Sequence, residues 1–196
     1  MKINEIFYSI QGEGYHTGRP AVFVRFSGCN LACSFCDTQH VSGKIMQETQ
    51  ILQEIRQYPC DFVVLTGGEP LLQVTPSFIS ALHKAGKFVA VETNGTIDAS
   101  NYAIDWVTCS PKTPFCNAEL NVVKCDEVKL VVNEEINAGM LDYFYENIDA
   151  DFYYLQPCDT GDKEKNEEII NHTIQLAKEN PKWRISLQTQ KILNVR

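Results

Sequence analysis

The sequence predicts an α/β protein whose mainly parallel sheet is open or curled into a partial barrel. Short apolar runs rich in β-branched and aromatic residues alternate with helical patterns along the chain, and this alternation is typical of βαβ units. A length of 196 residues is enough for one core but short for a full eightfold barrel. No Ser/Gly-rich or Pro-rich linker interrupts the chain, so we expect a single domain over residues 1–196.

The apolar and helical patterns place the elements in order. The expected strands are 21–26, 61–66, 87–92, 104–110, 127–132, 152–156 and 183–188. The expected helices are 48–57, 75–86, 134–147 and 166–180. Thr75 before Pro76 is typical of an N-cap followed by a first-turn proline, and Gly86 is typical of the residue after a helix end.

Composition excludes several partners. A formal net charge of −8 argues against a nucleic-acid partner, because binding a phosphate backbone requires clustered basic residues. Residues 1–14 lack the apolar region of a secretion signal, and no apolar run approaches the length of a membrane span. Eight cysteines without such a signal are typical of a reducing compartment, so we expect a cytoplasmic protein with no membrane partner.

Polar segments follow several of the expected strands. They are TGGEP (66–70), ETNG (92–95), SPK (110–112), LQPCD (155–159) and LQTQ (187–190). Parallel strands bring their carboxyl ends to one edge of a sheet, where α/β proteins bind ligands. The sequence therefore predicts an active site at that edge.

Three cysteines, Cys29, Cys33 and Cys36, have the spacing C-x3-C-x2-C within GCNLACSFCDT. A zinc site would need a fourth ligand, for which His40 or Cys60 is available, and three structural thiols are another interpretation. A [4Fe–4S] cluster held by three thiolates accounts for the odd number of ligands. The fourth iron would then be open to a ligand that carries an amino and a carboxylate group.

This motif resembles the signature of the radical S-adenosylmethionine (SAM) superfamily, whose members use the cluster to cleave SAM to a 5′-deoxyadenosyl radical. The segment 66–70, one strand later, resembles the second motif of that superfamily. Gly67 and Gly68 allow close approach of the backbone to a ligand, and Glu69 would add a fixed acceptor. The resemblance implies a trimmed partial (β/α) barrel of the radical SAM type.

Further segments, which extend over essentially the whole chain, resemble the 7-carboxy-7-deazaguanine synthases: SIQGEG (9–14), Arg25, CDT (36–38), ETNGT (92–96), SPK and LQTQKILNVR (187–196). The resemblance implies a lyase of queuosine and 7-deazapurine biosynthesis. It would convert 6-carboxy-5,6,7,8-tetrahydropterin to 7-carboxy-7-deazaguanine and ammonia by hydrogen abstraction and ring contraction. The implied cofactors are one [4Fe–4S] cluster, SAM and Mg²⁺. The implied partners are an electron donor such as a flavodoxin or ferredoxin, and a second copy in a homodimer.

The same resemblance assigns roles to residues. Cys29, Cys33 and Cys36 would hold the cluster, and Thr38 would bind Mg²⁺, because a neutral oxygen suits a hard cation. SAM would contact Phe35, Cys36, Asp37, Gly68, Ser110, Pro111, Lys112, Gln156, Pro157, Cys158 and Asp159. The pterin would contact Ile10, Gln11, Gly12, Glu13, Arg25, Thr66, Gln190 and Arg196, with Arg25 as a fork for a carboxylate.

Some residues depart from the family pattern or match no motif in it. Gln190 stands where the family commonly has His, although Gln190 can still donate a hydrogen bond. Outside the motif, we expect small core thiols rather than an auxiliary cluster at Cys109, Cys116, Cys125 and Cys158. The apolar residues Ile192, Leu193 and Val195 should keep the chain end packed. The resemblance implies that the terminal carboxylate of Arg196 reaches the substrate.

Two alternatives to this function remain at the level of sequence. A glycyl-radical enzyme activase is also short and carries the same cysteine spacing, but SIQGEG and QTQKILNVR have no explanation there. A non-catalytic zinc or iron–sulfur module is the other alternative. Metal content and colour distinguish that module, because an iron–sulfur protein is brown and a zinc protein is colourless.

Overall fold

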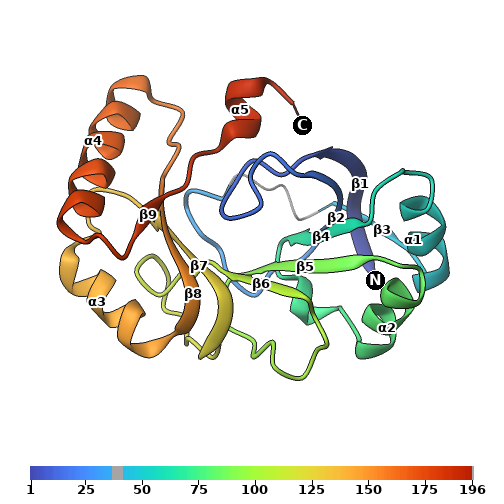
Figure 1. The fold of residues 1–196 in the computed structure, drawn as a ribbon. Coiled ribbons are helices and arrows are strands. Elements are labelled where there is room, and N and C mark those ends of the chain that lie inside the picture. Colours follow the sequence, from blue (N-terminus) through green and yellow to red (C-terminus); the bar gives the residue numbers. More distant parts are fainter. Residues whose placement is uncertain (37–41, 196) are drawn as a thin grey trace.

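A computed structural model describes residues 1–36 and 42–195. Within these residues the chain forms one nine-stranded sheet of order β3-β1-β2-β4-β5-β6-β7-β8-β9, shown in Figure 1. The strands are β1 (Lys2–Ile10), β2 (Pro20–Phe26), β3 (Lys44–Ile45), β4 (Phe62–Gly67), β5 (Phe88–Thr93), β6 (Trp106–Cys109), β7 (Lys124–Val132), β8 (Asp149–Pro157) and β9 (Arg184–Ile185). The helices are α1 (Glu48–Ile55), the 3₁₀ turn η1 (Pro70–Leu72), α2 (Pro76–Lys84), α3 (Ala138–Asn147), α4 (Lys163–Glu179) and α5 (Thr189–Leu193).

The sheet is parallel from β2 to β9, while β1 is antiparallel to both β2 and β3. In the described residues β3 and β9 are the two edges and do not pair with each other, so the barrel is open. This confirms the prediction of a partial barrel with a mainly parallel sheet.

The two faces of the sheet have different partners because side chains alternate along each strand. In β4, Val63 and Leu65 join the main core beneath the helices, whereas Phe62 and Val64 belong to a smaller cluster on the inner face. Figure 1 shows α1 to α4 outside the curved sheet. The inner face is therefore the interior of the partial barrel, where the strands also place polar side chains.

The amino ends of the strands are closed by aromatic packing. The loop 11–19 between β1 and β2 enters the interior, and its Tyr15 ring lies 4.9 Å from the Trp106 ring and 4.5 Å from the Phe152 ring. The His16 ring lies 4.8 Å from Phe62, at the start of β4. This plug fills the interior near the amino ends of the strands, and a cavity lies toward their carboxyl ends.

The caps predicted for α2 are confirmed. The Thr75 hydroxyl oxygen accepts a hydrogen bond from Phe78 N at 3.1 Å, and Gly86 follows the helix with φ of 72°. The helix α1 ends at Ile55, two residues before the predicted end, and the starts of two other helices also differ from the prediction. The helix α3 starts later because Asn137 caps Met140 N, and α4 starts earlier because Asp162 caps Lys165 N.

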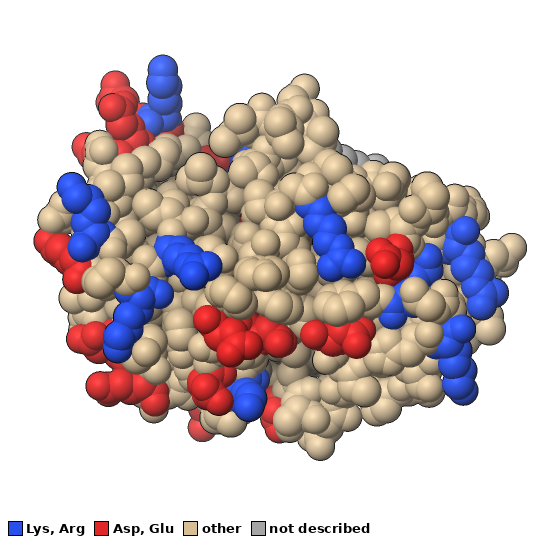
Figure 2. Space-filling view, viewed as in Figure 1, with Lys and Arg blue, Asp and Glu red and all other residues tan. Residues whose placement is uncertain are grey.

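Four short or antiparallel elements, β1, β3, η1 and α5, were absent from the sequence prediction. The predicted strand 183–188 is reduced to the two residues of β9. None of the helices in the described part of the chain has both the length and the apolar character needed to cross a membrane. On the face shown in Figure 2, basic side chains stand in small groups between acidic ones and form no continuous basic stripe.

Candidate active site

A cavity of about 280 Å³ opens at the carboxyl ends of the strands. Each of the five polar segments singled out in the sequence contributes to its wall. The predicted site residues that line it are Ile10, Gln11, Gly12, Glu13, Arg25, Cys29, Cys33, Phe35, Cys36, Thr66, Gly68, Ser110, Lys112, Gln156, Pro157, Cys158, Asp159 and Gln190. Pro111 is buried behind this wall and does not line it. Asp37, Thr38 and Arg196 lie outside the described residues.

The three cysteines follow β2 on one loop and face the cavity. Cys29 Sγ accepts a hydrogen bond from Leu31 N at 3.4 Å and one from Asn94 Nδ2 at 3.7 Å. Burial raises the pKa of the Cys29 thiol. Cys33 Sγ lies 3.5 Å from Cys116 Sγ, and burial together with that neighbouring thiol raises the pKa of Cys33.

The chemistry of this loop suits an iron–sulfur cluster. Its three thiols face one cavity, and backbone and amide N–H groups point at Cys29 sulfur, as is common around cluster sulfurs. No group of three His, Cys, Asp or Glu side chains within residues 1–36 and 42–195 is already arranged around a metal position. The fit therefore depends on the loop's position and donor set.

The interpretation in which Cys60 supplies the fourth ligand of a zinc site is wrong. Cys60 precedes β4, and its Sγ donates to Pro20 O at 3.2 Å, at the start of β2. The cysteine loop follows the other end of β2, so the length of the strand separates Cys60 from it. His40, the other candidate, lies outside the described residues.

The Gly-Gly pair of 66–70 packs against the cysteine loop. A Cβ on Gly68 would lie 2.0 Å from Gly28 O, and Gly67 has φ of 114°. Gly68 N donates to Phe26 O and Glu69 N to Gly28 O, each at 3.0 Å. The two glycines are thus required by close contact between two backbones, in addition to lining the cavity.

Glu69 does not face the cavity, so its expected role as an acceptor for a ligand is wrong. The side chain is fully buried, and its oxygens accept from Leu71 N, Thr93 Oγ1 and Asn94 N at 2.7 to 3.0 Å. Burial raises the pKa of this carboxyl. Glu69 instead joins the loops that follow β4 and β5.

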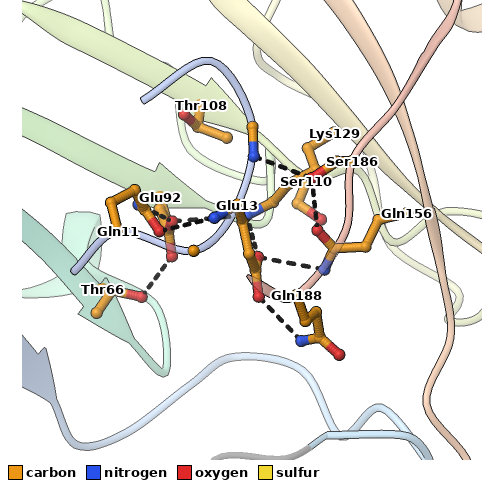
Figure 3. Close-up of polar contacts among 12 residues, drawn as sticks. Gln11, Glu13, Thr66, Glu92, Thr108, Ser110, Lys129, Gln156, Ser186 and Gln188 are labelled. Carbon is orange, nitrogen blue, oxygen red and sulfur yellow. Dashed lines mark hydrogen bonds and ion pairs between the residues drawn. The ribbon is translucent and has the colours of Figure 1, made fainter. Parts of the chain in front are cut away.

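Glu13 is the centre of a polar network at the base of the cavity (Figure 3). Its Oε1 accepts from Gln188 Nε2 at 2.9 Å and from Gln190 Nε2 at 3.0 Å. Its Oε2 accepts from Lys129 Nζ at 2.5 Å and from Gln156 Nε2 at 3.2 Å. Burial alone would raise the pKa of Glu13, but Lys129 and the amide donors outweigh burial and hold it well below its ordinary range.

A second carboxylate, Glu92 at the end of β5, belongs to the same network. Its Oε1 accepts from Gln11 Nε2 at 3.1 Å, and its Oε2 accepts from Thr66 Oγ1 at 2.8 Å. Figure 3 shows these side chains and Glu13 converging from different elements. Two residues that the resemblance assigns to the substrate, Gln11 and Thr66, are thereby oriented by one carboxylate.

Other predicted site residues have partners around the rim. Arg25 Nε lies 2.9 Å from Glu5 Oε1, an ion pair that fixes the guanidinium between β1 and β2. Lys112 Nζ donates to Ser110 Oγ, a hydrogen bond within the SPK segment. The Phe35 ring lies 4.7 Å from the Phe115 ring in an edge-to-face arrangement, which joins the cysteine loop to the segment after β6.

Polar contacts hold the terminal helix α5 over the cavity. Thr189 donates to Gly12 O through its backbone N and its hydroxyl, both at 3.0 Å, and Lys191 Nζ lies 2.5 Å from Asp159 Oδ2. The expectation that apolar residues hold this segment is wrong, because Ile192 is 72% exposed and Leu193 is 59% exposed. Gln190, at the position where the family commonly has His, donates a hydrogen bond to Glu13.

Sequence reasoning missed Glu127 and Lys129 of the network. Glu92 and Gln188 lie in segments predicted to form the site, but they were given no individual role. Lys129 is buried and lines the cavity, and the neighbouring Glu127 accepts from Tyr15 N at 2.7 Å. A signal for both was present in EVKLVV, where charged residues occupy alternate positions of a strand otherwise made of apolar residues. Alternation places such charges together on one face, here the interior.

The remaining cysteines differ among themselves. Cys109, Cys125 and Cys158 are buried, as small core thiols would be, although Cys158 also borders the cavity. Cys116 is partly exposed and contacts Cys33. Cys116 is therefore not a core thiol but a neighbour of the cysteine loop.

An open (β/α) barrel with a three-cysteine loop at its carboxyl edge defines a radical SAM protein. The profile of the radical SAM superfamily matches residues 23–179. The chain belongs to the 7-carboxy-7-deazaguanine synthase family of that superfamily. Its cofactors are accordingly a [4Fe–4S] cluster and SAM.

The sequence similarity to relatives extends along the entire chain. The 7-carboxy-7-deazaguanine synthase of Bacteroides thetaiotaomicron is 49% identical over 195 residues, which cover 100% of this chain and 98% of the relative. That of Haemophilus influenzae is 36% identical over 200 residues, covering 100% and 94%. The crystal structure of QueE from Escherichia coli is 28% identical with a TM-score of 0.79, covering 95% of this chain and 93% of the other.

A more distant structure shares the fold alone. TYW1 with a lysine-pyruvate adduct bound is 16% identical with a TM-score of 0.60, covering 82% of this chain and 73% of the other. Neither the glycyl-radical activase nor the non-catalytic module has support among these relatives.

Proposed function

We propose that this chain converts 6-carboxy-5,6,7,8-tetrahydropterin to 7-carboxy-7-deazaguanine with release of ammonia. The observation that carries the proposal is one cavity with two kinds of wall. The cysteine loop forms one wall, and the network around Glu13 and Glu92 forms the other. A substrate seated against the network would lie next to SAM, as direct hydrogen transfer between them requires.

The residues near the cysteine loop would hold the cofactors. Cys29, Cys33 and Cys36 would ligate three irons, and SAM would lie along Phe35, Gly68, Ser110, Lys112 and residues 156–159. When bound, the cluster and SAM supply the 5′-deoxyadenosyl radical that removes a hydrogen atom from the substrate. The chain itself would orient both ligands. Its aromatic side chains would also keep water out of the barrel at the amino ends of the strands.

The network suits a pterin because it offers donors and acceptors from several directions. Gln11 and Thr66 are oriented by Glu92, and Arg25 presents a guanidinium that can pair with a substrate carboxylate. Glu13 is held ionised by its neighbours. Gln190 of α5 donates to the Glu13 carboxylate. The Arg196 carboxylate would add a further acceptor to the substrate side of the cavity.

The remaining requirements are proposals of the same kind. Mg²⁺ would bind Thr38 with the substrate carboxylate and water, the coordination that a hard cation prefers. One electron per activation would come from a donor such as a flavodoxin or ferredoxin. The enzyme would work in the cytoplasm as a homodimer, with each chain folded as one domain.

The decisive experiment is an anaerobic assay of reconstituted protein with SAM, a reductant, Mg²⁺ and the carboxypterin. Mass spectrometry should detect 7-carboxy-7-deazaguanine, and ammonia should form in equal amount. Cys33→Ala should abolish turnover, whereas Cys60→Ser, a thiol change at the opposite end of the strands, should not. A brown protein that cleaves SAM without forming this product would contradict the proposal.

A further inference from the structure

Lys129 in β7 is a buried cation at the base of the cavity. The residue is only 5% exposed, and its Nζ lies 2.5 Å from Glu13 Oε2 and 3.5 Å from Glu92 Oε1. Burial alone would lower the pKa of Lys129, but Glu13, Glu92 and Glu127 outweigh burial and raise it well above its ordinary range. Lys129 is therefore a permanent positive charge between carboxylates from separate elements.

The two carboxylates that Lys129 contacts are not equivalent. Four hydrogen bonds from described residues reach the Glu13 carboxylate, and a carboxylate has about four acceptor positions. Glu13 is thus filled by protein donors. Glu92 accepts from Gln11 and Thr66, and its side chain keeps 23% of its surface exposed toward the cavity.

Other charges face the same lysine. Glu127, two residues earlier on the inner face of β7, attracts Lys129, and Lys112 from the segment after β6 repels it. Three carboxylates thus surround the Lys129 ammonium group. Without that group they would face one another in a poorly solvated site, and such groups do not all stay ionised at neutral pH.

We propose that Lys129 is a positioning residue for the substrate: it keeps Glu92 ionised beside the ionised Glu13, so that the N–H donors of the pterin meet an ionised acceptor at Glu92. This inference rests on the proposed function and deepens it. Lys129 acts through the two carboxylates, and the inference assigns it no contact with the cluster or SAM. The pterin half of the cavity should therefore depend on Lys129, and the SAM half should not.

Binding without turnover tests this role. Cluster-loaded protein would be titrated with 6-carboxypterin, an oxidised analogue of the substrate, and its fluorescence followed at pH 6 and pH 8 in the absence of SAM. We expect Lys129→Met to weaken binding at least about tenfold, the scale of a lost charge-assisted hydrogen bond. The ratio of variant to wild-type Kd should rise from pH 8 to pH 6, because the unshielded carboxylates take up protons. Taking the ratio cancels the ligand's own titration.

Two further variants separate this role from a structural one. Lys129→Arg keeps the cation and should recover most of the affinity. Lys112→Met, at a half-buried lysine of the cavity wall, should weaken SAM binding and leave the ratio of variant to wild-type Kd for 6-carboxypterin independent of pH. Iron content and melting temperature of each variant report folding, and Lys129→Gln replaces Lys129→Met if the latter does not fold.

Each contrary outcome has a distinct meaning. Equal 6-carboxypterin affinity in Lys129→Met and the wild type would overturn the inference, as would an equal loss of SAM binding. The ratio of variant to wild-type Kd could also fall from pH 8 to pH 6. Lys129 would then merely attract the carboxylate of the ligand, and this result would overturn the inference as well. Failure of the wild type to bind 6-carboxypterin while it binds SAM would contradict the proposed function itself, and the inference with it.

Discussion

The sulfur of Cys33 lies 3.5 Å from the sulfur of Cys116, so a proposed cluster ligand contacts a cysteine that belongs to no motif. The same two segments also meet through the Phe35 and Phe115 rings. Spacing along the chain does not show this contact, because 83 residues separate the two cysteines. It raises the question of whether Cys116 takes part in holding iron.

We predict that it does not. Anaerobically reconstituted protein should contain about four irons per chain, as one such cluster requires. Cys116→Ala should retain them, because C-x3-C-x2-C already supplies three thiolates, while Cys33→Ala should lose them. Iron and sulfide analysis with absorption spectra would measure both. Loss of the cluster in Cys116→Ala, or iron near twice that amount, would contradict a single cluster on three cysteines.

The second prediction concerns Thr38 and Mg²⁺. Thr38→Ala should keep its iron and its SAM affinity but respond weakly to added Mg²⁺, because a hard cation loses a neutral oxygen ligand. Turnover measured against Mg²⁺ concentration would show this, with Thr38→Ser as a control that keeps the hydroxyl. A Thr38→Ala enzyme with the Mg²⁺ dependence of the wild type would assign the hydroxyl to loop structure alone.

The third prediction concerns the end of the chain. The helix α5 lies against Gly12 and Glu13, and the resemblance to the family assigns the Arg196 carboxylate, which is outside the described residues, to the substrate. Deleting Arg196 or appending a C-terminal tag should lower kcat/KM at least about tenfold through a lost charge-assisted contact. Iron content and SAM affinity should not change. Arg196→Lys, which keeps the carboxylate, and an N-terminal tag are the controls. Unchanged kcat/KM in the C-terminally tagged enzyme would remove the terminus from the site.

The fourth prediction concerns pH and Glu127. Burial raises the pKa of Glu127 from 4.5 to about 7, despite attraction by Lys129. The folded protein then binds more protons than the unfolded chain between these values, so stability falls as pH rises through that window.

Glu127→Gln removes this titration and keeps an acceptor for Tyr15 N. We expect it to raise the free energy of unfolding at pH 8 by up to about 3 kcal/mol, since one pKa unit corresponds to about 1.4 kcal/mol. At pH 5 the change should be small. Denaturant unfolding at the two pH values would measure it, and an equal effect at both would contradict the assigned pKa.

The fifth prediction concerns the loop junction at Glu69. Glu69→Ala leaves Leu71 N and Asn94 N buried without their acceptor, so it should lower the free energy of unfolding by about 2–4 kcal/mol. Glu69→Gln keeps the size and one acceptor oxygen and should cost less. Unfolding curves of the three proteins would test this order. A Glu69→Ala protein as stable as the wild type would show that water replaces the carboxylate.

The sequence by itself determined the fold class, most of the parallel strands, the cysteine loop and the edge of the sheet that holds the cavity. These features are local, because alternation of apolar residues, helix caps and motif spacing depend on residues a few positions apart. The direction of each strand then carries the segments 66–70, 92–95, 110–112, 155–159 and 187–190 to the same side.

Only the tertiary structure decided which of these polar groups meet. Glu13, Lys129, Gln156 and Gln188 come from four separate parts of the chain, and no local pattern states their contact. Glu69 turned to the backbone of its neighbours, and α5 was held by polar contacts while its apolar residues faced outward. Each buried charge must be satisfied by whatever partners the packed chain brings within reach. Those partners depend on distances between remote segments, which sequence spacing does not contain.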